Sequence, residues 1–287
     1  MKTTAILLAT YNGKSYLKEQ IDSLYAQTDR DWTLYIHDDG STDGTQTFIE
    51  KCCEGRDNVQ ILRFPPAGGP MMNFLEMLRR VEADYYFFCD QDDVWMPDKI
   101  EVSKKRMFEI EAEHPGLPVV VHGDLAVVDE SLKPLLPSFW KYEDIYPERV
   151  TSFEVMGVSN LTTGCAMLFN GAARDVTPVP PPPLTPMHDF WVTACVFRAG
   201  GIVSAIPRPL LYYRQHSGNC IGAVSAGRSD WTYFLSNAWG ILRKNRRQYV
   251  MLKSLGYKSL YTYIKNKWAY KRYVMQKRRQ SEAGLSL

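Results

Sequence analysis

The stretch that decides the fold is Tyr-Tyr-Phe-Phe-Cys-Asp-Gln-Asp-Asp-Val-Trp at residues 85–95, an apolar run that ends in three carboxylates within four positions. Its apolar part predicts a buried strand, and its polar end predicts that the strand delivers acidic side chains to a cleft. Clustered like charges repel, so such a group is typical of a site for a divalent cation with bound phosphate. The alternative is a solvated acidic turn in which Asp93 or Asp98 caps a helix that begins at Pro97.

The composition of the 287-residue chain, with 45% hydrophobic and 23% charged side chains, is typical of a globular protein and excludes disordered and fibrous classes. The N-terminus does not resemble a signal peptide, and no run approaches about 18 apolar residues. We therefore expect a cytoplasmic protein, peripheral at most on the inner face of the cell membrane. The cysteines form no C-x-x-C pair, so we expect reduced thiols rather than zinc ligands or disulfides. They are Cys52, Cys53, Cys89, Cys165, Cys195 and Cys220.

The first 125 residues alternate strand-like and helix-like segments. This alternation predicts a mainly parallel sheet with helices on both faces. Beyond residue 125 the sequence predicts an irregular segment at 132–150, a strand at 165–169, a stiff proline run at 178–183 and a helix starting near His188. The strands expected in the first part are at 4–10, 32–36, 59–62, from Tyr85 onward, and at 119–122. The helices expected there include residues 17–24 and span 43–54, 72–81 and 97–113. Ser41 or Thr42 is expected to cap the helix at 43–54.

Polar loops follow three of the expected strands, at residues 10–13, 37–44 and 90–93. In a parallel sheet the carboxyl ends of the strands meet at one edge, where ligands bind. The three loops are therefore expected to converge on one pocket. For the loop at 38–41 an ordinary turn with a helix cap is an alternative, and both interpretations can hold together.

The chain carries five motifs in this order: Thr10-Tyr11-Asn12, Asp38-Asp39-Gly40-Ser41-Thr42-Asp43, Asp90-Gln91-Asp92-Asp93, Thr163-Gly164-Cys165 and His188-Asp189-Phe190-Trp191. Together they resemble the family 2 glycosyltransferases, over roughly residues 3–222. The form of residues 89–95 and the later Tyr-Arg-Gln-His at 213–216 look most like the bacterial rhamnosyltransferase-type members. The resemblance implies an α/β protein with the GT-A (nucleotide-diphospho-sugar transferase) fold, a mainly parallel central sheet flanked by helices and a helical C-terminal extension.

We expect a GT-A catalytic domain at residues 1–228 and a basic, aromatic helical tail at 229–287. Within the catalytic domain, residues 1–125 would form the nucleotide-binding half and residues 126–228 the acceptor-binding half.

Sugar transfer from a nucleoside diphosphate sugar must stabilise a departing diphosphate, and a cation held by carboxylates supplies that charge. Asp92 is the expected direct metal ligand. The resemblance places Asp90 beside the ribose or in the outer shell of the metal, and Asp93 is a weaker contributor. His216 is expected near the metal or phosphate. Mg²⁺ or Mn²⁺ suits such ligands.

The resemblance also implies a donor site for a UDP- or dTDP-sugar, with dTDP-rhamnose the favoured sugar donor. Asp39 would accept a hydrogen bond from the pyrimidine base, with Asp38 close by. Arg214 would contact the diphosphate, just before a loop at 217–219 that closes over the donor. The base and ribose would be wrapped by Thr10, Tyr11 and Asn12.

An inverting displacement needs a base that takes the proton of the acceptor hydroxyl. Asp189 is the candidate, because Phe190 and Trp191 provide apolar surroundings that can raise the pKa of a carboxylate. Its alternative role is that of a helix N-cap. Relatives often carry Glu-Asp where this chain has His-Asp, so His188 receives no role. An acceptor sugar could stack on Trp191 and the region of residues 139–140, which are equally consistent with core residues.

The tail concentrates positive charge: residues 231–280 hold thirteen Lys or Arg, eleven aromatic residues and no Asp or Glu. This pattern favours binding to an anionic membrane surface. The alternatives are a helical hairpin that packs its aromatic residues on the catalytic domain, and a nucleic-acid-binding segment.

The sequence therefore predicts a metal-dependent inverting glycosyltransferase (a hexosyltransferase) that acts on a glycan or lipid-linked acceptor in cell-surface polysaccharide synthesis, with no nucleic-acid partner. A sugar-nucleotide-synthesising nucleotidyltransferase is a rival, but residues 10–14 are not the glycine- and arginine-rich triphosphate loop that it would need. Binding of nucleic acid through the tail is the other rival, and it leaves the three acidic loops unexplained. The donor sugar, the acceptor, the linkage and the oligomeric state are left open.

Overall fold

A computed structural model describes residues 2–216 and 231–282 of the chain. The predicted alternation of strands and helices in its first part is confirmed, and all seven residues of β1 are buried. The elements of this part are β1 (Thr4–Thr10), α1 (Lys14–Tyr25), β2 (Thr33–Asp38), α2 (Thr45–Cys53), β3 (Val59–Ile61), α3 (Pro70–Arg80), β4 (Tyr85–Asp90), β5 (Val94–Trp95) and α4 (Lys99–Glu113).

The second part combines long strands with short helices and ends in two long helices. Its elements are β6 (Val119–Val128), β7 (Pro134–Leu136), α5 (Phe139–Tyr142), the 3-10 turns η1 (Pro147–Arg149), η2 (Met156–Val158) and η3 (Gly164–Ala166), then β8 (Met167–Asn170), α6 (Gly171–Asp175), α7 (His188–Arg198), β9 (Ile202–Arg214), α8 (Trp231–Ser254) and α9 (Leu260–Glu282).

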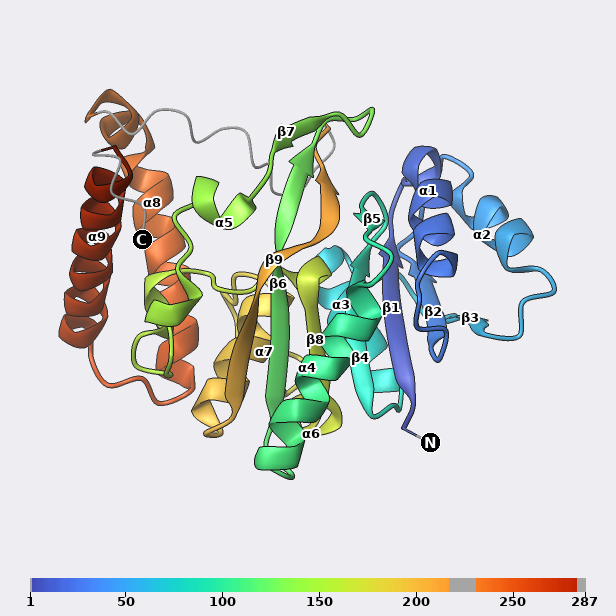
Figure 1. The fold of residues 1–287 in the computed structure, drawn as a ribbon, viewed down its shortest axis with the longest axis horizontal. Helices are drawn as coiled ribbons and strands as arrows, with labels where there is room; N and C mark the ends of the chain where they lie inside the picture. Colours follow the sequence, from blue (N-terminus) through green and yellow to red (C-terminus); the bar gives the residue numbers. More distant parts are fainter. Residues whose placement is uncertain (1, 217–230, 283–287) are drawn as a thin grey trace.

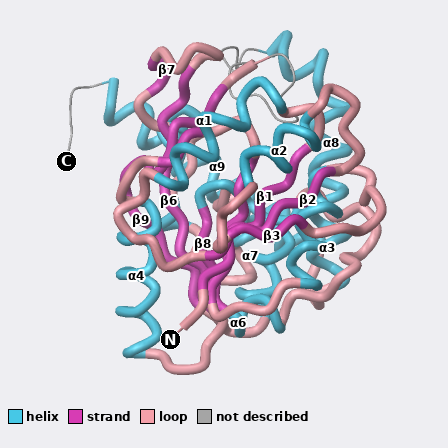
Figure 2. Tube along the Cα trace, turned by 90° about the vertical axis from the view of Figure 1, so that its right-hand side faces the viewer, coloured by secondary structure: helices cyan, strands magenta, loops and turns pink. Residues whose placement is uncertain are grey.

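The described strands form one mixed sheet in the order β3-β2-β1-β4-β8-β6-β9-β5, with β7 paired to β6. The strands β3, β2, β1 and β4 run parallel, as do β6 and β9, while β8 is antiparallel to both of its neighbours. Figure 1 shows the sheet in the middle of the molecule with α8 and α9 side by side at one end. In the turned view of Figure 2, helices lie on both sides of the strands. An α/β fold with a helix-flanked sheet and a helical C-terminal region is therefore confirmed.

Strand β4 is buried on both faces, which explains why its sequence is continuously apolar. Tyr86 and Phe88 pack into one core with α3 and α7, and Tyr85 and Phe87 pack into the other core with α1 and α4. The polar residues of the motif follow where the strand leaves these cores, so burial of the apolar run fixes the position of the acidic group.

The helices α2 and α3 begin at other residues than predicted, because of a glycine and a proline. Helix α2 begins at Thr45 rather than near Asp43, since Gly44 precedes it with a φ of 90°, in the left-handed region that favours glycine. Helix α3 begins at Pro70, two residues earlier than predicted, because proline suits the first helical position.

Strand β9 was not predicted at all, and β6 extends well past residue 122. The prolines at 207 and 209 interrupt the alternating pattern of β9. Strand β9 carries Arg214 at its end, so its register with β6, where Val128 lies opposite Arg214, places the later motif residues against the acidic loop.

Several alternatives are settled by packing. Trp140 and Trp191 are buried in the core. Asp98 directly precedes α4, but its side chain makes no capping hydrogen bond among the described residues. It forms an ion pair with Arg208 instead. The described cysteines are free, and Cys220 lies outside the described residues.

Candidate active site

A cavity of about 210 Å³ lies where the carboxyl ends of β1, β2 and β4 meet the start of α7. The three loops predicted to converge all contribute to its wall, together with the Thr163-Gly164 segment. Of the predicted site residues, those that line this cavity are Thr10, Tyr11, Asp39, Asp90, Asp92 and Asp189. The other four, Asn12, Asp38, Arg214 and His216, are not part of the wall but contact residues or loops that are.

The acidic group after β4 divides into an open and a buried part. Asp90 and Asp92 face the cavity, whereas Asp93 is fully buried and lies with Asp90 and Cys165 in a cluster whose potential ligand atoms are within 4.8 Å of one another. Burial raises the pKa of Asp90, and the charges of Asp92 and Asp189 raise it further. Carboxylates crowded in this way favour a bound cation, which would relieve their repulsion.

The donor set fits Mg²⁺ or Mn²⁺ at the cavity side. Carboxylate oxygens of Asp90 and Asp92 are accessible from the cavity, and Nε2 of His216 lies 2.9 Å from Oδ2 of Asp92. Burial raises the pKa of the Cys165 thiol well above its usual value, so this sulfur stays protonated and is a poor ligand for a hard cation.

A buried cation, Lys99, lies behind the acidic group and was not predicted from the sequence. Its Nζ donates a hydrogen bond to the backbone carbonyl of Cys165 and lies 3.3 Å from the centre of the Trp95 ring. Burial lowers the pKa of Lys99 to about 8. Its positive charge partly offsets the carboxylates at Asp90 and Asp93.

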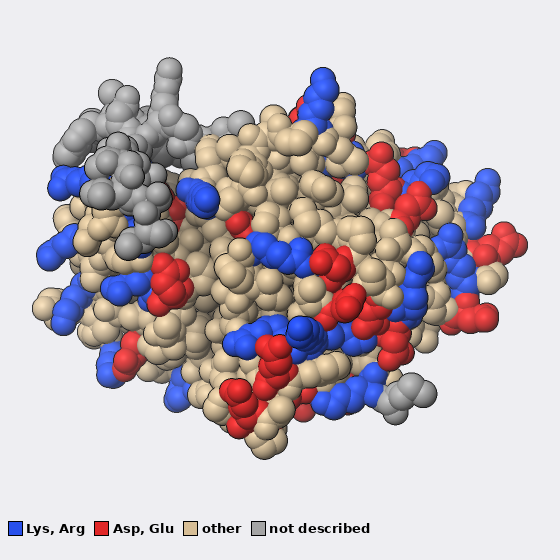
Figure 3. Space-filling model, viewed as in Figure 1, with Lys and Arg blue, Asp and Glu red and all other residues tan. Residues whose placement is uncertain are grey.

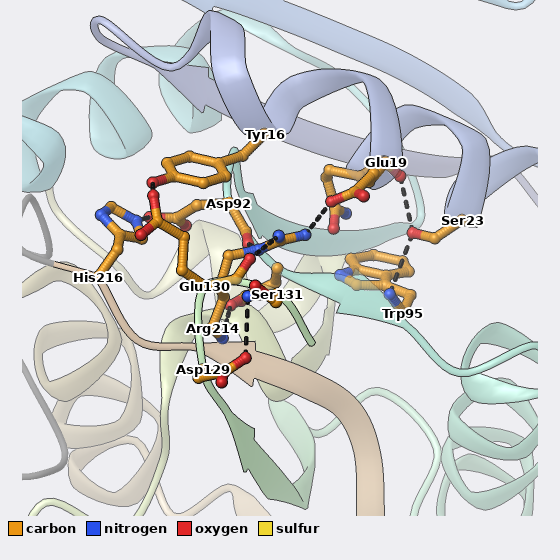
Figure 4. Close-up of polar contacts among 12 residues, drawn as sticks. Tyr16, Glu19, Ser23, Asp92, Trp95, Asp129, Glu130, Ser131, Arg214 and His216 are labelled. Atoms are coloured by element: carbon orange, nitrogen blue, oxygen red, sulfur yellow. Dashed lines mark hydrogen bonds and ion pairs between the residues drawn. The ribbon is translucent and has the colours of Figure 1, made fainter. Parts of the chain in front are cut away.

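Arg214 braces the acidic loop, and Figure 4 shows its side chain beside Asp92, Glu130 and Glu19. Its Nε donates to the backbone carbonyl of Asp92 at 2.8 Å, its Nη1 donates to the carbonyl of Glu130 at 2.7 Å, and its Nη2 pairs with Glu19. The guanidinium carbon also lies 5.0 Å from the centre of the Tyr16 ring. These contacts orient the loop that carries Asp92, and a contact between Arg214 and the diphosphate stays a prediction.

The ring of Tyr16 stacks on His216 with 4.4 Å between centroids, and its hydroxyl donates to Glu130 at 2.6 Å. Tyr16 thus holds the imidazole beside Asp92. No pattern in the sequence pointed to this role, because a tyrosine in the segment of α1 is consistent with an ordinary helix residue. Residues 217–219, predicted to cover the donor, lie outside the described residues.

The two neighbouring carboxylates after β2 face different partners. Asp38 accepts hydrogen bonds from Thr10, Ser41 and Gln46, which lower its pKa although its burial acts in the opposite direction. Asp39 lines the cavity and accepts from the backbone N–H groups of residues 67–69, just before α3. Asp38 therefore stabilises the turn, and Asp39 fixes the wall that faces a ligand.

Gln91 clamps the loop after β1 and was not predicted as a site residue. Its Oε1 accepts from the backbone N–H of Tyr11 at 2.8 Å and its Nε2 donates to the carbonyl of Tyr11 at 3.0 Å. A Cβ on Gly13 would lie only 2.0 Å from the same Oε1, so the close approach requires glycine. Asn12, with a φ of 47°, donates its backbone N–H to Ser41 at 2.7 Å. The predicted donor loop is thus held in one shape.

Asp189 lies in the first turn of α7, almost fully buried at the opposite wall of the cavity. Its Oδ2 accepts from Nδ2 of Asn160 at 3.3 Å and from the N–H of Gly164 at 3.2 Å. Met187, not Asp189, occupies the N-cap position. Burial raises the pKa of Asp189 to about 6, although these hydrogen bonds oppose the shift. The carboxyl group is thus poised to exchange a proton near neutral pH.

A larger cavity of about 660 Å³ lies between β6, β9 and the segment around α5. Its wall includes His122, Asp124 and Trp140, and Trp140 belongs to the region considered above for stacking of an acceptor sugar. None of the predicted catalytic, donor-binding or metal-binding residues is among the described residues that line it. The chemistry expected from the sequence therefore belongs to the smaller cavity.

The family model described as glycosyl transferase family 2 matches residues 5–176 of the chain. Among curated proteins, the dTDP-rhamnosyl transferase RfbG of Shigella flexneri is 37% identical over 101 residues, which is 33% of this chain and 34% of RfbG. The chain thus spans about a third of the length of this relative.

Two solved structures are similar in fold. S. aureus TarS 1-349 in complex with UDP has a TM-score of 0.55 and 19% identity, covering 75% of this chain and 61% of TarS. The mannosyltransferase PcManGT from Pyrobaculum calidifontis, in complex with GDP-Man and Mn²⁺, has a TM-score of 0.56 and 16% identity, covering 94% of this chain and 69% of PcManGT. The predicted GT-A fold is thereby confirmed.

Proposed function

Because the chain belongs to glycosyl transferase family 2, we propose that its cavity binds a nucleoside diphosphate sugar and transfers the sugar, with inversion, to an acceptor hydroxyl. The observation that carries the proposal is that Asp39, Asp92 and Asp189, which are far apart in the sequence, line one cavity. A scattered arrangement of these carboxylates would have left no room for a shared reaction centre.

In the proposed mechanism, Asp39 accepts a hydrogen bond from the base of the donor, and Tyr11 packs along the nucleotide. Asp92, with Asp90 and His216, would hold Mg²⁺ or Mn²⁺, which supplies positive charge to the departing diphosphate. The Mn²⁺ and GDP-Man bound to the similar fold of PcManGT support this assignment.

Asp189 takes the proton of the acceptor hydroxyl as that oxygen attacks the anomeric carbon from the face opposite the diphosphate. The bond from the sugar to the diphosphate breaks as the new glycosidic bond forms, and the diphosphate leaves as an anion. Asn160 and Gly164 orient the carboxylate by their hydrogen bonds to its Oδ2. Burial keeps the pKa of Asp189 high enough for it to act as a base near neutral pH.

The similarity to RfbG favours dTDP-rhamnose as the donor. The proposed acceptor is a glycan or a lipid-linked glycan in cell-surface polysaccharide synthesis. Because TarS, which is similar in fold, was crystallised with UDP, UDP-sugars are also among the donors to be tested.

The test is hydrolysis of donors in the presence of Mn²⁺ or Mg²⁺, measured as release of the nucleoside diphosphate from a panel of UDP- and dTDP-sugars. We expect at least one donor to be hydrolysed in a metal-dependent way. We expect the Asp92→Asn variant to lose metal-dependent donor binding, and Asp57→Asn, which removes an exposed carboxylate far from the cavity, to behave as wild type. A folded protein that neither binds nor hydrolyses any donor would exclude the proposal.

A further inference from the structure

The described aromatic side chains of α8, of α9 and of the turn between them lie on two sides. Three tyrosines face inward and donate hydrogen bonds: Tyr257 to the carbonyl of Glu154 at 2.5 Å, Tyr270 to the carbonyl of Asp144 at 2.8 Å, and Tyr263 to Gln248 of α8 at 3.1 Å. Packing of tail aromatics on the rest of the chain, one of the alternatives weighed from the sequence, is thus found for Tyr257 and Tyr270.

Other aromatic and aliphatic residues of the two helices point away from the body. Trp239 is 86% exposed, Tyr261 75% and Trp268 62%, values far above those of the buried tyrosines. Exposed aliphatic side chains follow them at helical spacing along α8 and α9. The outer surface, as we call it below, consists of Trp239, Leu242, Val250, Leu260, Tyr261, Ile264, Trp268 and Met275. Large apolar side chains that are exposed together on one helix pair are typical of an interaction surface, and we treat the outer surface as one.

The Lys and Arg residues of α8, α9 and the turn between them also lie on two sides, one toward the body and one around the outer surface. On the side toward the body, Arg278 pairs with Asp144 and Lys258 pairs with Glu154, so these positive charges are matched by carboxylates of the catalytic part. Around the outer surface the exposed cations have no acidic residue of the same helices beside them, because residues 231–280 contain none. Figure 3 shows Lys and Arg side chains along the margin formed by α8 and α9. The exposed cations in question are Arg243, Arg246, Lys253, Lys265, Lys271, Arg272 and Arg279.

We propose that the outer surface docks on an anionic lipid bilayer. Tryptophan and tyrosine side chains are suited to the headgroup region, the aliphatic side chains to the boundary of the acyl chains, and the flanking Lys and Arg to lipid phosphates. None of the described helices is long and apolar enough to cross a membrane, so the contact lies in the plane of the interface.

Two other partners fit these residues less well. A second copy of the chain would bring its own exposed cations against those of the first, and like charges repel. Single-stranded nucleic acid stacks its bases on aromatic rings, but it gives no comparable partner to the aliphatic side chains of Leu242, Val250 and Ile264. A bilayer accommodates the aromatic, aliphatic and cationic groups together.

The first experiment measures co-sedimentation of the full chain with vesicles of phosphatidylcholine alone or with about one-third phosphatidylglycerol, at low and high salt. We expect binding to the anionic vesicles that weakens with salt. A variant that lacks four outer cations should bind roughly 600-fold more weakly, because each cation near an anionic surface contributes about fivefold. A control that loses four exposed cations of the catalytic part should bind as wild type. The test variant is Arg243→Gln/Arg246→Gln/Arg272→Gln/Arg279→Gln and the control is Lys51→Gln/Arg63→Gln/Lys105→Gln/Lys133→Gln.

The second experiment tests the apolar contribution with the variant Trp239→Ser/Trp268→Ser. Its matched control, Phe108→Ser/Leu135→Ser, removes exposed apolar side chains from the catalytic part. The tryptophan variant should lose most vesicle binding, while its donor hydrolysis in solution stays unchanged because the outer surface is far from the cavity.

Three outcomes would overturn the proposal. The first is equal binding of the wild type to neutral and anionic vesicles, or to neither. The second is a wild-type dimer in solution that the tryptophan variant no longer forms, which would assign the outer surface to a second copy. The third is RNA binding that the four-cation variant loses without any vesicle binding by the wild type, which would assign the surface to nucleic acid.

Discussion

Replacement of Arg214 by methionine should destabilise the protein even without any ligand, because its guanidinium holds the acidic loop. The variant removes the donors to the backbone carbonyls of Asp92 and Glu130 and breaks the pair with Glu19. Each of these hydrogen bonds from a charged guanidinium contributes about 1–2 kcal/mol, at the low end for such bonds because Asp92 is half-buried and Glu130 is exposed, so the loss of both costs about 2–4 kcal/mol. The pair adds at most about 1 kcal/mol, because the Glu19 side chain is half exposed and water screens its charge.

For a chain of this size, about 2–4 kcal/mol corresponds to a fall in Tm of roughly 4–8 °C. The difference in Tm is measured by thermal denaturation of the ligand-free wild type and variant. The matched control is Arg208→Met in the same strand, whose pair with Asp98 is exposed on both sides, so its Tm should fall by no more than about 2 °C. We expect Arg214→Lys to keep the positive charge but to recover only part of the lost stability, since an ammonium group cannot reach all three acceptors. An Arg214→Met variant as stable as Arg208→Met would refute the bracing role and would favour a direct contact with the diphosphate.

Three further predictions concern the reaction itself. The kcat/KM for transfer should fall as pH drops below about 6, because burial raises the pKa of Asp189 and the protonated carboxyl cannot act as a base; a pH–rate profile that stays flat through this range contradicts the assignment. The Asp189→Asn variant should bind the donor normally in a thermal-shift assay but transfer sugar about 100-fold more slowly or worse, and wild-type turnover by this variant would show that the base is elsewhere. The Gly13→Ala variant should displace Gln91 from its two hydrogen bonds to Tyr11 and weaken donor binding by about 1–2 kcal/mol, as read by isothermal titration; an unchanged Kd would mean that the clamp does not shape the donor site.

The fold of the first 125 residues could be predicted in large part because several of its strands are buried on both faces and are continuous apolar runs in the sequence. Residues 85–89 are the clearest case, since every residue packs into one of two cores. The polar residues after each strand then had to lie at one edge of the sheet. The position of a loop can therefore be predicted from the sequence where it follows from strand direction alone.

Strand β9 escaped prediction for the opposite reason. Its two prolines and partly exposed residues break the alternating pattern, and only pairing with β6 and β5 makes the segment a strand. The bracing roles of Tyr16, Gln91 and Arg214 depend on that pairing or on contacts between distant loops. Such contacts are set by tertiary packing, which leaves no periodic signal in the chain.

The central claim is that one cavity holds the nucleotide, the cation and the base, and a crystal structure with Mn²⁺ and a non-transferable analogue of the nucleoside diphosphate sugar tests it most directly. The account predicts the ion in contact with Asp92, the nucleotide base at Asp39 and the anomeric carbon of the sugar facing the wall that carries Asp189. A nucleotide bound instead in the larger cavity beside His122 and Trp140, or an ion that does not touch the loop after β4, would contradict it.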